Sequence, residues 1–425
     1  MDLFQGYRCS ICGSQYSPGE VTYNCPKDGG NLDIALDYPS IQRQVTPETI
    51  FASGEYNLWR YLPVLPIDDP GREGTPLRAA GGTPVYNPQQ LAGELGLREL
   101  WLKDESRNPT ASFKDRASAI VVARARQIGA KVVVTASTGN AGAALAGMAA
   151  AVDQRAVIFA PKTAPPAKIA QLLIYGARVF LVDGTYDDAF DLTIKASQEF
   201  GWYCRNTGFN PFTAEGKKTA AFEIWEWMAR ESKVVKRKWN RQNPDLDSHL
   251  AIFVSVGDGN IISGIHKGFK DLLALGWIEK IPRLFGVQAE GSAAIANAFH
   301  AGVETITPVS AHTIADSISV DLPRDGIRAV RAVKETNGSY IIVSDQEILD
   351  AIASLGKVGI FAEPAGAASF AGLVHAVGAG LIDREDPVLV INTGSGLKDV
   401  KAAMQASGEA PVIEPTIDAV KRFLK

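Results

Sequence analysis

The sequence has no long hydrophobic run, and this absence argues against a membrane-spanning protein. No stretch approaches the roughly 18–20 consecutive apolar residues that a transmembrane helix needs, although 46% of the 425 residues are hydrophobic. The first six residues also lack the basic start and apolar core of a secretory signal peptide. We therefore expect a cytoplasmic protein without a membrane partner.

An excess of charge is absent as well. The 43 Lys and Arg residues nearly balance 47 Asp and Glu residues, which gives a net charge of −4. A protein dedicated to nucleic acid carries a strong basic excess for the phosphate backbone, so we expect no nucleic-acid partner. The hydrophobic content is sufficient for substantial cores, and the length allows two or three domains.

Cysteine is scarce, which excludes a fold held together by disulfides. Three of the four cysteines, Cys9, Cys12 and Cys25, stand near the start of the chain. They form a Cys-x-x-Cys-Gly motif and a Cys-x-x-Asp-Gly motif, so Asp28 takes the place of the fourth ligand of a zinc ribbon. The sequence predicts a zinc-ribbon-like segment over residues 1–38. The alternative is a ribbon that has lost its metal and survives as a small cap on the next domain.

The rest of the chain alternates short apolar runs with helix-length segments. The runs predict strands that are buried on both faces, at 100–102, 132–134, 156–159, 179–182, 252–254, 284–287 and 388–391. Helical segments between them include 114–129, 140–151, 187–200, 214–230 and 346–355. This alternation predicts an α/β fold with parallel sheets that are wrapped by helices on both sides.

Polar segments follow several predicted strands, at the sheet edge where parallel sheets bind ligands. After the first strand, Lys114 opens a helix, where burial and the helix dipole would lower the pKa of its amine and make it a nucleophile or base. An exposed lysine at a helix start is the alternative. After the second strand, residues 135–142 place the hydroxyls of Ser137 and Thr138 at a helix N-terminus, which suits a carboxylate or simply caps the helix.

Two glycine-rich segments follow later strands. The amides of residues 255–260 could converge on a phosphate monoester, whereas the spacing of the glycines does not match a dinucleotide fingerprint. Residues 392–399 offer hydroxyl groups, one of which could reach a ring nitrogen. A lysine nucleophile, a carboxylate loop, a phosphate loop and a hydroxyl partner are together what a pyridoxal phosphate enzyme requires.

Six motifs, in order across nearly the whole chain, resemble the threonine synthases, which belong to the tryptophan-synthase-β-like group of fold type II pyridoxal phosphate enzymes. They are the Cys-rich start, Ser112-Phe113-Lys114-Asp115-Arg116, Ser137-Thr138-Gly139-Asn140, Glu215-Gly216-Lys217-Lys218-Thr219, Glu363-Pro364-Ala365 and Thr393-Gly394-Ser395-Gly396-Leu397-Lys398-Asp399.

The resemblance implies two open, twisted, mostly parallel sheets flanked by helices, together with the small ribbon. It implies a linker and opening strands of a large domain at 39–106, a small mobile α/β domain at 107–212 and a large cofactor-binding domain at 213–425. A homodimer and a small amino acid substrate are expected as partners.

The resemblance also implies roles for single residues. Lys114 would bind pyridoxal 5'-phosphate covalently and act in catalysis. The other cofactor contacts would be Phe113, Asn140, Gly257, Asp258, Gly259, Asn260 and Thr393. Substrate contacts would be Ser137, Thr138, Gly139, Asn206, Thr207 and Lys218. The implied reaction converts O-phospho-L-homoserine and water to L-threonine and phosphate.

One departure from the family pattern concerns the substrate's phosphate. The family usually has an Arg two residues after an Asn-Pro pair, where this chain has Thr213. Loss of a guanidinium weakens the case for a phosphorylated substrate unless Lys217, Lys218 or Arg116 compensates. The alternatives are a serine or threonine dehydratase, a β-replacement enzyme resembling cysteate synthase, or a non-catalytic zinc-ribbon binding protein.

Overall fold

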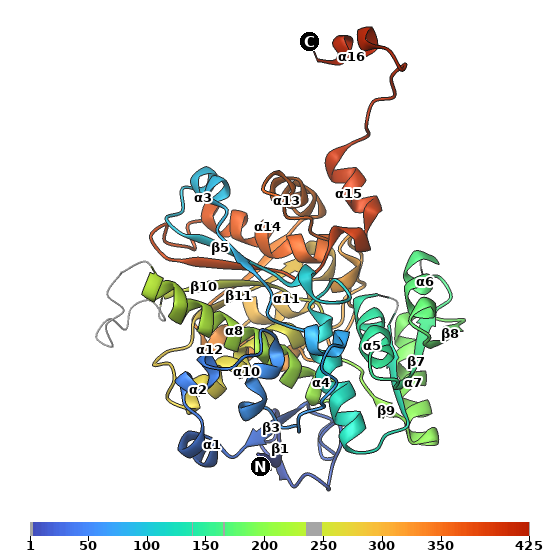
Figure 1. Cartoon of the computed structure of the whole chain (residues 1–425), viewed down its shortest axis with the longest axis vertical. Coiled ribbons are helices and arrows are strands. Elements are labelled where there is room, and N and C mark those ends of the chain that lie inside the picture. The colour runs from blue at the N-terminus through green and yellow to red at the C-terminus, as the bar shows by residue number, and fades with distance from the viewer. Residues whose placement is uncertain (1–2, 138, 165, 235–248, 425) are drawn as a thin grey trace.

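Three β-sheets lie beside one another in the computed structural model, which describes residues 3–137, 139–164, 166–234 and 249–424 (Figure 1). The six-stranded sheet occupies the middle of the view, the four-stranded sheet lies to the right, and a three-stranded sheet near the N-terminus lies at the bottom. The fold class expected from the sequence is confirmed: the two larger sheets are mostly parallel and are flanked by helices.

The six-stranded sheet is parallel except for its edge strand β4. Its order is β12 (Tyr340–Val343), β11 (Arg283–Ala289), β10 (Ala251–Ser255), β13 (Val388–Asn392), β5 (Leu100–Asp104) and β4 (Val85–Tyr86). Alternate residues of β10 enter different cores: Ile252 and Val254 pack in one cluster, and Phe253 packs in another. Because strand side chains alternate between faces, the sheet is covered on both sides.

The four-stranded sheet is wholly parallel, in the order β8 (Arg178–Val182), β7 (Arg155–Pro161), β6 (Val132–Ala136) and β9 (Tyr203–Cys204). The small antiparallel sheet has the order β2 (Gln15–Tyr16), β1 (Phe4–Cys9) and β3 (Leu32–Leu36). All seven apolar runs in the sequence therefore form strands of the two parallel sheets, as predicted.

The α-helices are α1 (Tyr38–Gln44), α2 (Pro47–Phe51), α3 (Gln89–Leu95), α4 (Lys114–Gln127), α5 (Asn140–Ala150), α6 (Pro166–Ile174), α7 (Tyr186–Phe200), α8 (Phe212–Val234), α10 (Asn260–Ala274), α11 (Ala294–His300), α12 (Gly326–Glu335), α13 (Asp345–Lys357), α14 (Pro364–Gly378), α15 (Val400–Ser407) and α16 (Ile417–Phe423). The short 3-10 helices are η1 (Leu58–Val64), η2 (Pro76–Ala79), η3 (Glu105–Arg107), η4 (Glu290–Ser292), η5 (Asp316–Ile318) and η6 (Gly396–Lys398). Among the helices of the described ranges, none combines the length and apolar character that crossing a membrane requires.

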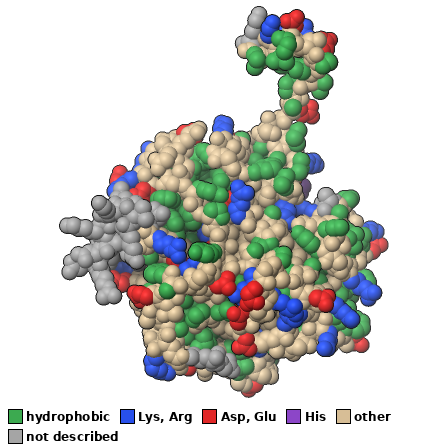
Figure 2. Space-filling model, viewed as in Figure 1, with side chains coloured by type: hydrophobic (Ala, Val, Ile, Leu, Met, Phe, Trp, Pro, Cys, Tyr) green, Lys and Arg blue, Asp and Glu red, His purple; other side chains and the backbone are tan. Residues whose placement is uncertain are grey.

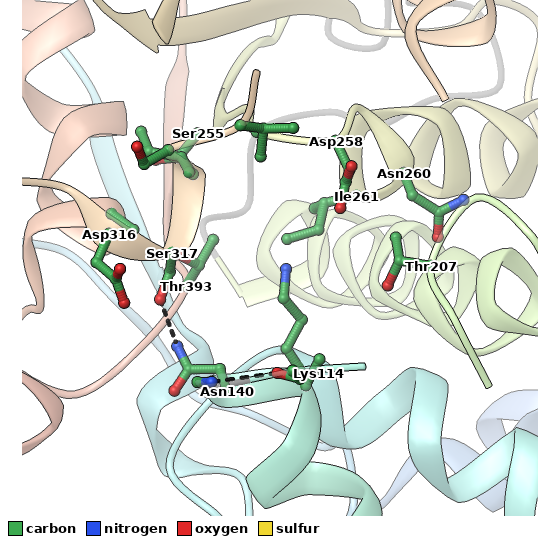
Figure 3. Close-up of a pocket in the computed structure, with 18 of the residues that line it drawn as sticks. Lys114, Asn140, Thr207, Ser255, Asp258, Asn260, Ile261, Asp316, Ser317 and Thr393 are labelled. Carbon is green, nitrogen blue, oxygen red and sulfur yellow. Dashed lines mark hydrogen bonds between the residues drawn. The ribbon is translucent and has the colours of Figure 1, made fainter. Parts of the chain in front are cut away.

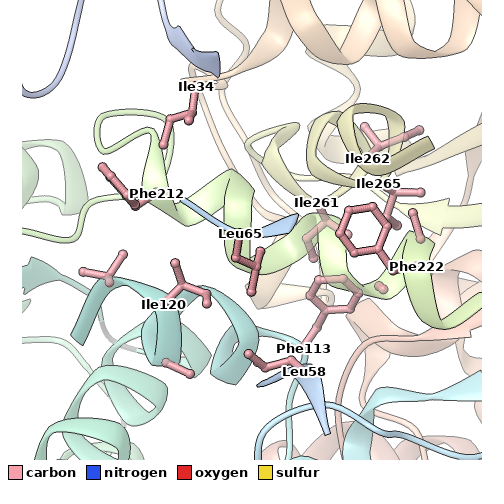
Figure 4. Close-up of a cluster of buried hydrophobic side chains, with 14 of the residues drawn as sticks. Ile34, Leu58, Leu65, Phe113, Ile120, Phe212, Phe222, Ile261, Ile262 and Ile265 are labelled. Atoms are coloured by element: carbon pink, nitrogen blue, oxygen red, sulfur yellow. The ribbon is translucent and has the colours of Figure 1, made fainter. Parts of the chain in front are cut away.

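One apolar cluster joins the ribbon to both larger sheets (Figure 4). It brings Ile34 of β3 together with Ile120 of α4, Phe222 of α8 and Ile262 of α10, all of which are buried. The cluster therefore fixes the start of α4 against the ribbon and the long helix α8. By contrast, the C-terminal helix α16 stands away from the body and exposes apolar side chains such as Phe423 (Figures 1 and 2).

A buried ionic cluster fixes the first turn of α4. The Arg116 guanidinium donates to Glu105 at 2.7 Å and to Glu223 at 2.6 Å, and Lys103 Nζ lies 2.7 Å from Glu223. Burial would raise the pKa of Glu105, but the charges of Arg116 and Lys103 hold it below the ordinary value. The two carboxylates therefore stay ionised inside the protein, where each has a cationic partner.

We expect Arg116→Met to destabilise the protein by about 3–5 kcal/mol, because it leaves two buried carboxylates short of a partner. Arg107→Met is the matched control: the Arg107 side chain is 60% exposed and pairs with Asp104 at 3.2 Å, so its loss should cost less than about 1 kcal/mol. Urea denaturation at neutral pH measures both changes. Equal stability of the two variants would contradict a structural role for the cluster.

Candidate active site

A cavity of about 350 Å³ lies between the two larger sheets, where the polar segments predicted to bind ligands meet. Its walls come from the starts of α4, α5 and α10 and from loops that follow β6, β10 and β13. Most of the residues predicted to contact cofactor or substrate line it: Phe113, Lys114, Ser137, Gly139, Asn140, Thr207, Gly257, Asp258, Gly259, Asn260 and Thr393. Thr138 lies outside the described residues. The predicted metal ligands Cys9, Cys12, Cys25 and Asp28 are not among the cavity residues and gather in the ribbon.

Lys114 extends into the middle of this cavity (Figure 3). Burial is the main cause that lowers the pKa of its amine to about 8, and the positive charge of Arg205 lowers it further. Asp258 and Glu363 act in the opposite direction. With that pKa, about a tenth of the Lys114 amine is uncharged at pH 7, and the uncharged form is the one that attacks a carbonyl carbon.

The residues on either side of Lys114 fix its position. Asp115 accepts a hydrogen bond of 2.6 Å from the backbone amide of Thr110, and Arg116 belongs to the buried ionic cluster. The backbone amide of Phe113 donates to the carbonyl of Thr393 at 2.9 Å. These bonds place the loop after β13, which carries the Thr393 hydroxyl, beside Lys114.

The backbone just before Lys114 adopts an uncommon conformation. Ala111 has a φ of 64°, in the left-handed region that favours glycine. Its carbonyl accepts a hydrogen bond of 3.1 Å from the amide of Ser395, which ties it to the loop after β13. Such local strain is retained where surrounding contacts fix it, and it is common beside active sites.

The loop between β10 and α10 forms a cradle in which two closely packed positions are glycines. A Cβ added at Gly259, whose φ is 89°, would lie 2.7 Å from the carbonyl oxygen of Asp325, and one added at Gly257 would lie 2.8 Å from Cα of Ile318. The loop therefore needs glycine at both positions, and it places the N-terminus of α10 at the cavity. The buried hydroxyl of Ser255 lines the cavity and has no hydrogen-bond partner. These features fit an anion such as a phosphate monoester.

Asp258 is the acidic exception in this cradle. Its carboxylate accepts a hydrogen bond of 3.2 Å from the backbone amide of Arg324, which gives it a partner outside the glycine loop. Burial raises the pKa of Asp258 above the ordinary value, although that bond and the charges of Lys114 and Lys217 oppose the rise.

The side-chain amide of Asn140, at the start of α5, contacts a carboxylate that the sequence analysis left without a role. Asn140 Nδ2 donates to Glu363 Oε1 at 2.7 Å and lies 3.3 Å from the Ser317 hydroxyl (Figure 3). Burial raises the pKa of Glu363, while the bond from Asn140 lowers it. The Glu-Pro-Ala motif could have identified Glu363, because a glutamate directly before a helix in a matched motif is a candidate site residue.

Of the residues predicted to hold the substrate, some line the cavity and others lie behind its wall. Thr207 lines the cavity, whereas Asn206 supports its wall: its Oδ1 accepts a hydrogen bond of 2.8 Å from the amide of Ala136. Lys218 is not among the cavity residues, because its amine is buried in ion pairs of 2.6 Å with Glu215 and 2.8 Å with Asp271.

The neighbouring lysine faces the cavity instead. Lys217 Nζ donates to Asn260 Oδ1 at 2.6 Å. Burial lowers the pKa of Lys217 well below the ordinary value, and the charges of Lys114 and Arg205 add to this effect. Thr213, which stands where the family has an arginine, is fully buried and its hydroxyl donates to the carbonyl of Asn210 at 2.7 Å. Arg116 is held in the ionic cluster described above, so of the three proposed substitutes only Lys217 lines the cavity.

Arg205 is a cation that the sequence analysis missed. It is fully buried directly behind the cavity wall, where its Nη1 donates to the Thr207 hydroxyl at 2.7 Å and its Nη2 has no hydrogen-bond partner. Burial lowers the pKa of Arg205 to about 10, which leaves it charged at neutral pH. Its position next to Asn206 and Thr207 in the sequence was the available signal, since those two residues were already expected to contact the substrate.

The cavity thus combines a reactive amine, an anion cradle at a helix N-terminus and a neutral hydroxyl on the opposite loop. This set fits a phosphorylated aromatic aldehyde: the amine can bind its carbonyl carbon, the glycine loop its phosphate and Thr393 its ring nitrogen. Arg205 and Lys217 add positive charge next to the space that remains for a second ligand.

Comparisons with known proteins agree with this geometry. Residues 77–394 match the family described as "Pyridoxal-phosphate dependent enzyme". The chain is 39% identical to the threonine synthase of Methanocaldococcus jannaschii, over 98% of this chain and 99% of that protein. It is 36% identical to that of Methanosarcina acetivorans, over 98% of each chain.

Solved structures show the same fold at lower sequence identity. Threonine deaminase isoform 2 from Solanum lycopersicum superposes with a TM-score of 0.64 at 22% identity, over 87% of this chain and 95% of that one. Maize serine racemase superposes with a TM-score of 0.61 at 23% identity, over 76% and 91%. The family match covers more than half of the sequence, and the chain belongs to the pyridoxal-phosphate dependent enzymes.

Proposed function

We propose that this protein is a threonine synthase, which converts O-phospho-L-homoserine and water to L-threonine and phosphate. The observation that carries the proposal is the similarity, along almost the entire chain, to two threonine synthases. The cations Arg205 and Lys217 support it, because the substrate brings a phosphate dianion in addition to the one on the cofactor. Dehydratases of the same fold act on substrates without that second phosphate.

Four parts of the chain would hold the cofactor. Lys114 would bind its carbonyl carbon, residues 257–260 its phosphate, Thr393 its ring nitrogen and Asn140 its phenolic oxygen. A hydroxyl at Thr393, in place of a carboxylate, leaves the ring nitrogen without a proton, which suits elimination and replacement reactions. When bound, pyridoxal phosphate supplies an electron sink for the bonds at Cα of the amino acid attached to it.

Lys114 would carry the protons of the reaction. With a pKa of about 8, its amine can accept a proton from Cα of the substrate and then one from Cβ, and can return a proton later. Its position in the centre of the cavity allows contact with both carbons. The amides and hydroxyl of Ser137 and Gly139, at the start of α5, would hold the substrate carboxylate.

Arg205, Thr207 and Lys217 would bind the substrate's phosphate. Thr207 and Lys217 line the cavity, and Arg205 lies one hydrogen bond behind Thr207 with Nη2 free to donate. The charge of Arg205 lowers the pKa of Lys114, and the charges of Lys114 and Arg205 lower that of Lys217, so a phosphate dianion should bind there favourably. Arg205 would then bind the substrate's phosphate in place of the arginine that the family has at the position of Thr213.

Three further expectations from the sequence remain predictions. These are a cytoplasmic location, a homodimer, and a division into a mobile segment at 107–212 and a large domain at 213–425, with 39–106 as the linker and opening strands. Movement of the small domain toward the large one would exclude water from the cavity during the reaction.

The function is tested by offering the purified protein single substrates. We expect L-threonine and phosphate from O-phospho-L-homoserine, and at least 100-fold slower turnover of O-phospho-L-serine, L-serine or L-threonine, which corresponds to about 2.7 kcal/mol of discrimination. Release of ammonia and a 2-oxo acid from L-threonine as the fastest reaction would instead identify a dehydratase.

Lys114→Ala should lower turnover of O-phospho-L-homoserine by roughly 1,000-fold or more, because it removes the base and the covalent attachment of the cofactor. It should also abolish fixation of the cofactor to the protein by borohydride, as measured by peptide mass mapping. Lys131→Ala, at an exposed lysine, is the control and should behave like the wild type. Undiminished turnover in Lys114→Ala would contradict the proposed site.

Cofactor uptake should depend on pH through the Lys114 amine. Because only the uncharged amine attacks, the rate at which the cofactor-free protein binds pyridoxal phosphate should rise about tenfold per pH unit below pH 8 and level off above about pH 9. In Arg205→Gln the midpoint should move to higher pH, since a positive charge that lowers the pKa of Lys114 is removed. A rate that still rises steeply at pH 10 in the wild type would contradict the lowered pKa.

Arg205→Gln should raise KM for O-phospho-L-homoserine by about 10- to 100-fold, because a charge-assisted hydrogen bond to the phosphate contributes about 1.5–3 kcal/mol. Its kcat should change less, since Arg205 does not reach the reacting carbons. Arg178→Gln, at an exposed arginine, is the control. An unchanged KM, with unchanged inhibition by inorganic phosphate, would remove Arg205 from the phosphate site.

A further inference from the structure

We propose that the ribbon binds one zinc ion through Cys9, Cys12, Cys25 and Asp28, and that this ion stabilises the contacts by which the ribbon positions the segment 204–210 at the cavity. The second part rests on the proposed function, whereas the metal site does not. One ligand atom from each of the four residues lies within 4.8 Å of all the others.

Two of the distances among these atoms are close to the edges of a tetrahedral zinc site. Cys12 Sγ lies 3.8 Å from Cys25 Sγ, and Cys9 Sγ lies 3.3 Å from Asp28 Oδ1. With Zn–S bonds of about 2.3 Å and a Zn–O bond of about 2.0 Å, tetrahedral geometry requires S–S edges of about 3.8 Å and S–O edges of about 3.5 Å. A disulfide between Cys12 and Cys25 would need an S–S distance of about 2.0 Å.

The two turns that carry the ligands have the same backbone conformation. The amide of Gly13 donates to the carbonyl of Cys9 at 3.1 Å, and the amide of Gly29 donates to the carbonyl of Cys25 at 2.9 Å. The two glycines have φ values of 71° and 70°. Asp28 therefore occupies, in the second turn, the position of Cys12 in the first.

The Asp28 carboxylate is oriented toward the cysteines. Its Oδ1 accepts a hydrogen bond of 2.9 Å from the amide of Gly30, and a Cβ at Gly30 would lie 2.9 Å from both that oxygen and Cys9 Sγ. Within the described residues, no Lys or Arg side chain forms an ion pair with Asp28, and Lys27 Nζ donates to the Ser14 hydroxyl instead, at 2.9 Å. Three cysteine side chains and one carboxylate therefore gather without a Lys or Arg partner among the described residues. Thiolates favour zinc over calcium or magnesium, which prefer sites made only of oxygen.

The ribbon contacts the segment that carries Arg205 and Thr207. The Tyr23 hydroxyl, on the ribbon, accepts a hydrogen bond of 2.8 Å from the amide of Cys204, and its ring stacks on Phe209 at 4.4 Å. Asn31 Nδ2 donates to the carbonyl of Gly208 and, at 3.0 Å, to that of Arg324.

Both ribbon residues belong to the part of the chain that the metal would organise. Tyr23 precedes Cys25 by two residues, and Asn31 follows Asp28 by three. The β1–β3 pairing and the apolar cluster hold one end of the ribbon, whereas the stretch between the two ligand turns has only the two-residue strand β2. A small segment of this kind commonly depends on a metal for its stability. Loss of the ion should therefore release the segment 204–210 from the ribbon.

The metal site is tested on the full-length protein, produced with zinc in the medium and without a metal-binding tag. Inductively coupled plasma mass spectrometry should find about one zinc ion per chain in the wild type and in Asp28→Cys. It should find less than about 0.1 zinc ion per chain in Cys25→Ser. Cys204→Ala is the matched control, since it removes the one cysteine outside the site and should keep the zinc. Zinc below about 0.1 per wild-type chain, iron in its place, or unchanged zinc in Cys25→Ser would each overturn the site.

The second part is tested by hydrogen exchange at the amides of residues 204–210. Removal of zinc by a chelator should speed this exchange by at least tenfold and raise KM for O-phospho-L-homoserine more than it lowers kcat. Tyr23→Phe should speed exchange of the Cys204 amide while the zinc content stays at one, which separates a positioning contact from the metal site. Exchange unchanged by zinc removal would overturn the coupling. Failure of the proposed function would leave the zinc content and the exchange rates as expected.

Discussion

The site depends on holding one buried lysine amine in a fixed position between two mostly parallel sheets. Lys114 begins α4, and the next two residues are buried charged side chains, each held by its own partners. Arg116 joins α4 to η3 and α8 through Glu105 and Glu223, so the helix cannot rotate without breaking a buried ion pair. The position of the Lys114 amine is thus set by the buried charges that follow it in the sequence.

The basic side chains around the cavity are destabilised in their charged forms by burial, and a bound anion would reduce this destabilisation. Lys114, Lys217 and Arg205 share a small buried volume, and the pKa of each is lowered. Asp258 and Glu363 offset part of this charge, although burial raises the pKa of each of them. Anions that bind the folded protein therefore stabilise it, and phosphate groups are the anions that the glycine cradle fits.

The ribbon differs from the catalytic sheets in what stabilises it. The larger sheets contain strands that are buried along nearly their whole length, such as β6 and β10, whereas β3 of the ribbon alternates buried and half-buried residues and the ribbon carries a cluster of thiols. Its contacts through Tyr23 and Asn31 end on the segment that carries Thr207. The N-terminal ribbon thereby supports a segment that lines the cavity.

The sequence by itself determined the parallel sheets, Lys114, the glycine cradle and the candidate metal ligands, because each depends on a local pattern: an apolar run, a lysine after a strand, two glycines, or cysteines at fixed spacing. Only the tertiary structure decided which cations reach the cavity. Lys217 and Lys218 differ by about 100° around α8, so the packing of α8 against α4 and α10 selects Lys217. Likewise, β9 has two residues and no periodic signal, and Arg205, which directly follows it, is held against β6 by a backbone hydrogen bond of 2.7 Å to the carbonyl of Val134.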